Sequence, residues 1–169
     1  MAGPVKGAGR ITRLALLTAI ALTIFLAEAQ LPALTAVPGV KLGLANIVTV
    51  YAMFALGPGD ALLVLSGRVF LGAVFSGQMM TLIYSAAGGF LSWCVLCLLR
   101  KLLTGEQIWL ASPVVAVFHN LGQLLAAAAV LRSWAVMAWL PYLIIAAILA
   151  GLFTGVAAQA LLRRLSGLS

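Results

Sequence analysis

Long apolar runs, separated by short polar or proline- and glycine-containing breaks, fill almost the whole chain. A helix needs about 20 apolar residues to cross the hydrocarbon core of a bilayer, and tilted or partly buried helices can be shorter. Helices are predicted over residues 11–28, 41–56, 61–75, 79–99 and 114–131, with a last run that ends at residue 162. The pattern therefore predicts an all-α integral membrane protein with six transmembrane helices in a single domain, residues 1–169.

The breaks carry recognisable start and stop signals. Asp60 follows a glycine- and proline-rich break and is expected to cap the third helix. Ser112 and Pro113 are expected to open the fifth helix, with proline in its first turn. The second and third runs are short, and the third contains an arginine. These two runs could instead form a hairpin that does not fully cross, which would leave the topology of the rest unchanged.

Composition excludes a soluble enzyme. Of the 169 residues, 64% are hydrophobic and only 8% are charged, whereas a soluble domain carries about a quarter charged residues. The basic N-terminal segment and the apolar run that ends near Glu28 have the shape of a signal peptide. We interpret this run as the first membrane helix.

The net charge of +7 does not indicate nucleic-acid binding, because the basic residues lie at the edges of apolar runs. The positive-inside rule then places both ends of the chain in the cytoplasm. The cytoplasmic segments would hold Lys6, Arg10, Arg13, Arg100, Lys101, Arg163 and Arg164. Only Lys41 and Arg132 would lie outside, where Trp134, Trp139 and Tyr142 would form an interfacial belt.

Arg68 is the most informative residue, because a charged side chain inside a membrane span is costly and usually functional. It could bind a carboxylate or phosphate group of a substrate. It could also form a structural pair with Glu28 or extend its charged end toward an interface.

His119, Asn120 and Gln123 form a second polar group, near mid-depth in the fifth run. Residues 119 and 123 share a helix face, and residues 120 and 123 are neighbours at the i, i+3 spacing. Such residues often hold helices together, but three within five residues favour the lining of a pocket. One histidine without a second ligand does not indicate a metal site.

Other polar residues fall in the predicted outer half of the bundle: Glu28, Lys41, Asn46, Gln78 and Tyr84. They could line the same pocket or simply lie at helix ends in the headgroup region. Cys94 and Cys97 form a C-x-x-C pair without further ligands, and we expect both to be free and to behave as small apolar residues. Gly151 and Gly155 form a G-x-x-x-G pair that permits close helix packing.

No catalytic set is evident. The chain has three acidic residues in all, Glu28, Asp60 and Glu106, too few for chemistry that needs several metal-binding carboxylates. It has no phosphate-binding loop of the G-x-x-x-x-G-K-[ST] type. We expect neither a cofactor nor an enzymatic activity.

Several segments resemble the signatures of the Gx transporter family, also called heptaprenyl diphosphate synthase component I. They are PGVKLGLANIV at residues 38–48, the run around Arg68, SAAGG at residues 85–89 and HNLGQ at residues 119–123. The resemblance covers nearly the whole chain. The family is similar to the substrate-binding S components of energy-coupling factor (ECF) transporters, which are six-helix proteins of the bacterial cytoplasmic membrane.

The resemblance implies that the protein binds a small molecule from outside, such as a vitamin or quinone precursor. It would then tilt while docked to a coupling protein driven by two ATPases. Ala15 and Ala19 match the A-x-x-x-A pattern that makes this contact in S components. The synthase name implies instead a non-catalytic partner in polyprenyl diphosphate synthesis, and a structural subunit of a membrane redox complex is a third alternative.

Overall fold

The computed structural model of the chain describes residues 7–30, 41, 43–103 and 107–166. Every regular element in these residues is helical, which confirms the predicted all-α class. The elements are α1 (Ala8–Glu28), α2 (Asn46–Ala55), α3 (Pro58–Ser76), α4 (Met79–Leu102), α5 (Ile108–Leu131), the short 3₁₀ helix η1 (Trp134–Trp139) and α6 (Leu140–Ser166).

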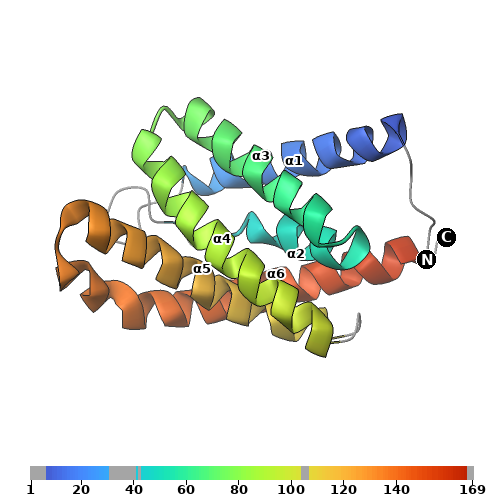
Figure 1. Cartoon of the computed structure of the whole chain (residues 1–169). Helices are drawn as coiled ribbons and strands as arrows, with labels where there is room; N and C mark the ends of the chain where they lie inside the picture. Colours follow the sequence, from blue (N-terminus) through green and yellow to red (C-terminus); the bar gives the residue numbers. More distant parts are fainter. Residues whose placement is uncertain (1–6, 31–40, 42, 104–106, 167–169) are drawn as a thin grey trace.

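The long helices form one bundle in which α1 begins and α6 ends at the same end (Figure 1). α5 packs along both α4 and α6, whereas α1 lies at the edge of the bundle against α3. Five helical stretches are long and apolar enough to cross a membrane: α1, α3, α4, α5 and the stretch formed by η1 and α6. The protein is therefore a multi-pass membrane protein by the length and composition of its helices.

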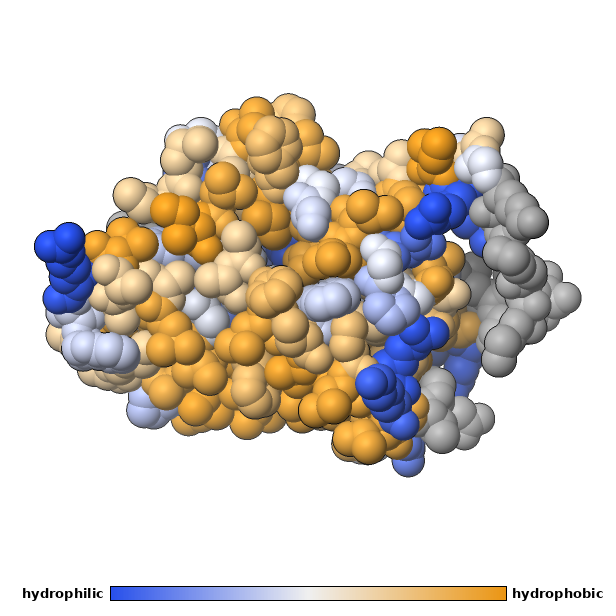
Figure 2. All heavy atoms as spheres, viewed as in Figure 1, coloured by the Kyte–Doolittle hydropathy of each residue, from blue (hydrophilic) through white to orange (hydrophobic). Residues whose placement is uncertain are grey.

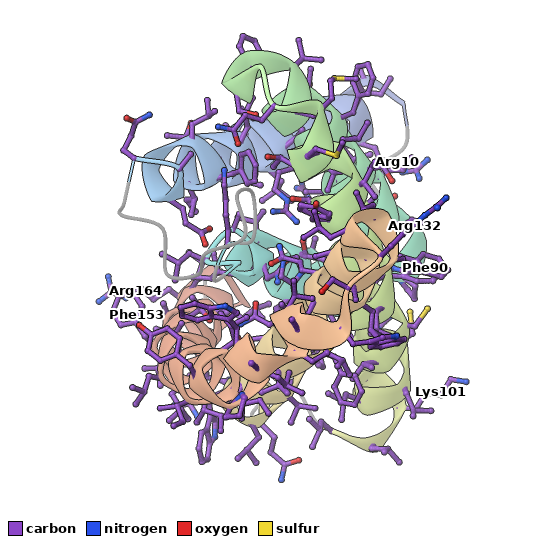
Figure 3. The ribbon with its side chains drawn as sticks, turned by 90° about the vertical axis from the view of Figure 1, so that its left-hand side faces the viewer. Arg10, Phe90, Lys101, Arg132, Phe153 and Arg164 are labelled. Carbon is purple, nitrogen blue, oxygen red and sulfur yellow. The ribbon has the colours of Figure 1, made fainter. Side chains whose placement is uncertain are left out.

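The outer surface of the bundle supports this assignment. Figure 2 shows apolar residues over the middle of the visible face and hydrophilic residues toward its two ends, most of them at the end where α1 begins. Phe90 and Phe153 point outward on opposite sides of the bundle (Figure 3) and are 60% and 75% exposed. Large aromatic side chains exposed in this way are suited to lipid rather than to water.

The second predicted span differs from expectation. We expected a helix over residues 41–56, but α2 has only 10 residues and begins at Asn46. At 1.5 Å per residue it is about 15 Å long, half of the roughly 30 Å hydrocarbon core. Gly43 has a φ of 80°, and its carbonyl accepts a hydrogen bond from the Asn46 N–H, so a turn rather than a helix precedes α2. The alternative that the second run does not fully cross fits this length, whereas α3 is long enough to span.

Two predicted helix starts were also wrong. α3 begins at Pro58, and Asp60 lies inside its first turn without capping it. The Asp60 carboxylate instead pairs with Arg10 of α1 at 2.6 Å. α5 begins at Ile108, before the predicted start, because the side chain of Gln159 accepts the Ile108 N–H at 3.0 Å and satisfies a free donor of the first turn.

Pro113 consequently lies inside α5, where α6 packs closely against it. A Cβ atom on Gly151 would lie 2.4 Å from Pro113 Cα, and one on Gly155 would lie 2.8 Å from the Trp109 carbonyl oxygen. Pro113 has no N–H to bond that carbonyl. Close approach of the two backbones at G-x-x-x-G is thereby confirmed, and a Ser112–Thr154 hydrogen bond of 2.9 Å adds to it.

We predict that Gly151→Ala lowers the free energy of unfolding by about 1–3 kcal/mol, because the added methyl group meets backbone atoms that cannot give way. Gly59→Ala is the matched control, since nothing lies within 4 Å of a Cβ atom there. Thermal unfolding of both variants in detergent checks this. Equal unfolding midpoints would contradict the packing described for α5 and α6.

Candidate functional site

Polar groups converge where α2 begins inside the bundle. The Glu28 side chain, at the end of α1, accepts hydrogen bonds from the backbone N–H of Gly43 at 2.7 Å and of Leu44 at 3.0 Å. Glu28 is 6% exposed, so its carboxylate lies inside the protein and not in the headgroup region. Both carboxylate oxygens serve to hold the non-helical turn before α2.

Gln123 of α5 holds the same segment from the other side. Its Oε1 accepts the backbone N–H of Lys41 at 3.0 Å, and its Nε2 lies 2.9 Å from Nε2 of His119. Gly88 of α4 makes room for this pair, because a Cβ atom there would lie 2.6 Å from the His119 carbonyl oxygen and 2.8 Å from Gln123 Cγ. Close packing of α4 on α5 therefore fixes where both side chains lie.

Arg68 enters the site from α3. It is 1% exposed, and its Nη2 donates to Asn46 Oδ1 over a long 3.4 Å. Among the described residues no carboxylate lies within ion-pair distance of it, so the predicted structural pair with Glu28 is not a salt bridge. The Phe25 ring lies 5.8 Å from the Arg68 guanidinium carbon and 3.8 Å from Lys41 Nζ. Both cations thus lie beside one aromatic ring. This attraction partly offsets the cost of removing their positive charges from water.

Several buried polar atoms around this point have no hydrogen-bond partner among the described residues. Arg68 Nε and Asn46 Nδ2 are such atoms within the site, Thr49 Oγ1 lies one turn after Asn46 on α2, and Asn120 Oδ1 belongs to a side chain that bonds α6. Leaving a buried donor or acceptor unpaired costs about 1–3 kcal/mol, so most buried polar groups in native proteins have partners. Unpaired donors at Arg68 and Asn46 are what a ligand-free binding site would contain.

The structure brings together six of the residues selected from the sequence: Glu28, Lys41, Asn46, Arg68, His119 and Gln123. Asn120 is buried but faces α6, where its Nδ2 donates to the Leu143 carbonyl at 3.2 Å. Tyr84 is buried in an apolar cluster with Leu124 and Leu143. Ala15 and Ala19 are exposed on α1, and Cys94 and Cys97 are free cysteines on α4.

Sequence reasoning missed three contributors. In the sequence Phe25 cannot be distinguished from the other apolar residues of a span, yet its ring lies beside the charged groups of Lys41 and Arg68. Gly43 was part of a motif without an assigned role, and a Cβ atom there would lie 2.8 Å from His119 Cδ2. Thr49 follows Asn46 by one helical turn, which is the one signal that could have found it.

The electrostatics of the site are those of N–H donors and nearby cations. The described residues contain no group of three or more His, Cys, Asp or Glu side chains that could hold one. Lys41 lies in the connection between α1 and α2, outside the candidate spans. Burial lowers the pKa of its ammonium group, and the Glu28 carboxylate opposes this shift. The arrangement offers several N–H donors and positive charge, which suits a polar or anionic organic group.

We predict that Glu28→Ala frees the turn before α2. The substitution leaves the N–H groups of Gly43 and Leu44 unpaired, at a cost of roughly 1–3 kcal/mol each. Amide hydrogen exchange at these two residues should accelerate strongly. Asp60→Ala is the control, because it removes a carboxylate from an ion pair whose arginine is exposed, and solvent screens such pairs so that they contribute little to stability. Unchanged exchange in Glu28→Ala would show that other groups hold the turn.

Comparison with known proteins gives one match. No curated protein and no solved structure matched the chain. Residues 17–161 match the family described as heptaprenyl diphosphate synthase component I, and this stretch includes every residue of the convergent site. The match spans most of the 169 residues, and the chain therefore belongs to the heptaprenyl diphosphate synthase component I family.

Proposed function

We propose that the protein is a non-catalytic, substrate-binding membrane subunit of a transporter, similar to an ECF S component, for uptake of a small molecule. The observation that carries this proposal is the convergence of polar side chains from α1, α2, α3, α5 and the connection before α2, with buried atoms left unpaired. Small-molecule sites have this form, a few oriented polar groups within apolar surroundings.

A purely structural role accounts less well for these residues. A structural subunit would pair its buried polar groups with one another, as Ser112 and Thr154 do between α5 and α6. Among the described residues, by contrast, Arg68 has one long hydrogen bond and an unpaired Nε. Non-helical backbone at membrane depth is also tolerated only where protein buries it or where it lines a cavity. Gly43 and Ala45 are non-helical and buried, so this backbone is enclosed by protein.

Entry from outside follows from the charge distribution. Arg10 lies near the start of α1, and Lys101 and Arg164 lie in the last turns of α4 and α6, whereas Arg132 directly follows α5. In Figure 1 the start of α1 and the ends of α4 and α6 lie at one end of the bundle, and the end of α5 lies at the other. The positive-inside rule makes the first end cytoplasmic. Glu28 terminates α1 near the opposite end, so the site lies toward the outside of a bacterial cytoplasmic membrane.

Docking to a coupling protein is part of the proposal. α1 is the least buried of the long helices and contacts only α2 and α3. Its Ala15 and Ala19 are exposed and small, so another helix could approach its backbone closely there. The ATPases would act through that coupling protein.

A second candidate function follows from the family match. The family name describes a component of heptaprenyl diphosphate synthase, and the match covers residues 17–161. The protein would then be a non-catalytic membrane component that supports polyprenyl diphosphate or quinone synthesis. The chain's three acidic residues are too few for a magnesium–diphosphate centre of its own.

We predict that α3 begins inside the cell and η1 lies outside. Single cysteines at exposed positions, Gly59→Cys and Ala135→Cys, would be introduced after Cys94 and Cys97 are changed to serine. A membrane-impermeant maleimide should label Ala135→Cys in intact bacteria and Gly59→Cys only after permeabilisation. The reverse pattern would overturn the orientation and with it the entry from outside.

We predict that the gently purified protein carries a small molecule at a 1:1 ratio, visible by native mass spectrometry in detergent. Arg68→Ala and His119→Ala should each lower its occupancy at least about tenfold, because a hydrogen bond to a charged group contributes roughly 1.5–3 kcal/mol. Arg132→Ala is the control, an exposed arginine at the end of α5. A ligand-free protein with all three variants equally stable would favour a structural subunit.

A further inference from the structure

The convergent site holds more positive than negative charge. Arg68 and Lys41 supply two cations, and Glu28 is the one carboxylate beside them. Asp60, the other carboxylate among the described residues, pairs with Arg10 far from the site. The site therefore has a formal excess of one positive charge. Such an excess is costly in a low-dielectric interior unless something neutralises it.

Among the described residues, Glu28 forms no hydrogen bond or ion pair with either cation. Its two oxygens accept the N–H groups of Gly43 and Leu44 at 2.7 and 3.0 Å. Its attraction for Arg68 and Lys41 is therefore through space only. Arg68 and Lys41 are both positively charged, and both lie beside the Phe25 ring. They are therefore close enough to repel each other. An anion at this point would relieve the repulsion.

The unpaired donors indicate where that anion would bind. In the part of the chain that the structure describes, Arg68 Nε has no partner, and Asn46, whose Oδ1 already contacts Arg68, has an unpaired Nδ2. Two N–H donors on touching side chains suit the two oxygens of a carboxylate or a phosphate group, which arginine binds in a fork geometry. The Arg68 and Asn46 side chains are at least 95% buried. His119, whose ring lies next to Gly43, is equally buried.

We propose that the ligand carries one singly charged anionic group, a carboxylate or a singly charged phosphate ester, bound by Arg68 and Asn46. This inference rests on the proposed function, of which it names the substrate class. One negative charge neutralises the excess of the site. A diphosphate carries several negative charges and would replace a positive excess with a negative one, so a prenyl diphosphate does not match this site.

The test uses small head-group probes that need no knowledge of the rest of the ligand. The thermal unfolding midpoint of the full chain is measured in detergent at constant ionic strength, against rising concentrations of acetate, inorganic phosphate, acetamide and inorganic diphosphate. A ligand that binds only the folded protein raises the midpoint in a saturable way. We expect acetate, inorganic phosphate or both to do so, and acetamide and diphosphate to have no such effect.

Variants assign the effect to the site. Arg68→Gln should abolish the response to acetate, whereas Arg132→Gln, an exposed arginine outside the site, should retain it. Because Arg68→Gln could fail to fold, Lys41→Gln provides a second measurement. Lys41 is only half-buried, and its loss removes the formal excess. The apparent dissociation constant for acetate should then rise at least about tenfold, which corresponds to 1.4 kcal/mol.

Several outcomes would overturn the anion inference. They are no saturable response to acetate or phosphate, an equal response in Arg68→Gln or Lys41→Gln, and a stronger response to diphosphate than to acetate. A neutral molecule that co-purifies at 1:1 and is lost in His119→Ala would also overturn it, but would leave the proposed transport function intact.

Measurements with added lipid distinguish a phosphate group of a lipid headgroup from that of a small soluble molecule. The measurement is repeated with phosphatidylglycerol added to the detergent, and with phosphatidylcholine as the lipid without net charge. Stabilisation by phosphatidylglycerol that Arg68→Gln loses would support the anion site and assign it to a lipid headgroup, which would overturn uptake of a small molecule. A response to free acetate or phosphate that phosphatidylglycerol leaves unchanged supports both the anion site and the transport function.

Discussion

The hydrogen bonds of Glu28 to the Gly43 and Leu44 N–H groups determine how the interior of this bundle is built. α2 begins in the buried interior of the bundle, so the backbone of the turn before it must be satisfied by protein groups rather than by water. Gln123 does the same for Lys41 from the opposite side. These contacts place a carboxylate and an amide at depth. The close approach of α4 and α5 at Gly88 in turn positions Gln123 and His119 against this turn.

The sequence predicted most of the helices because lipid imposes a simple rule: a long apolar run must be a helix. That rule failed for residues 41–56, since a short apolar segment enclosed by other helices can satisfy its backbone with side chains instead. It also failed at the start of α5, where the partner of Ile108 is Gln159, on another helix and 51 residues away. No local pattern contains that information.

The candidate site was partly predictable from the sequence, because polar residues are rare inside apolar runs and are therefore easily identified. Helix geometry separates His119 and Gln123, four residues apart on one face, from Asn120, which is turned about 100° away toward α6. Phe25 could not be found in this way. An aromatic residue in a span is ordinary, and its role depends on Gly72 of α3, where a Cβ atom would lie 2.7 Å from the ring.

α1 connects the site to the outside of the bundle. It carries Glu28 and Phe25 on its buried face and Ala15 and Ala19 on its exposed face. Among the described helices it contacts only α2 and α3, and glycines permit the close contacts with α3, Gly67 against Thr18 and Gly72 against Phe25. A partner that displaced α1 would therefore move the Glu28 carboxylate and the Phe25 ring together. The turn before α2 would lose its hydrogen bonds as Arg68 and Lys41 lost their aromatic neighbour, so ligand affinity and docking would be coupled through one helix.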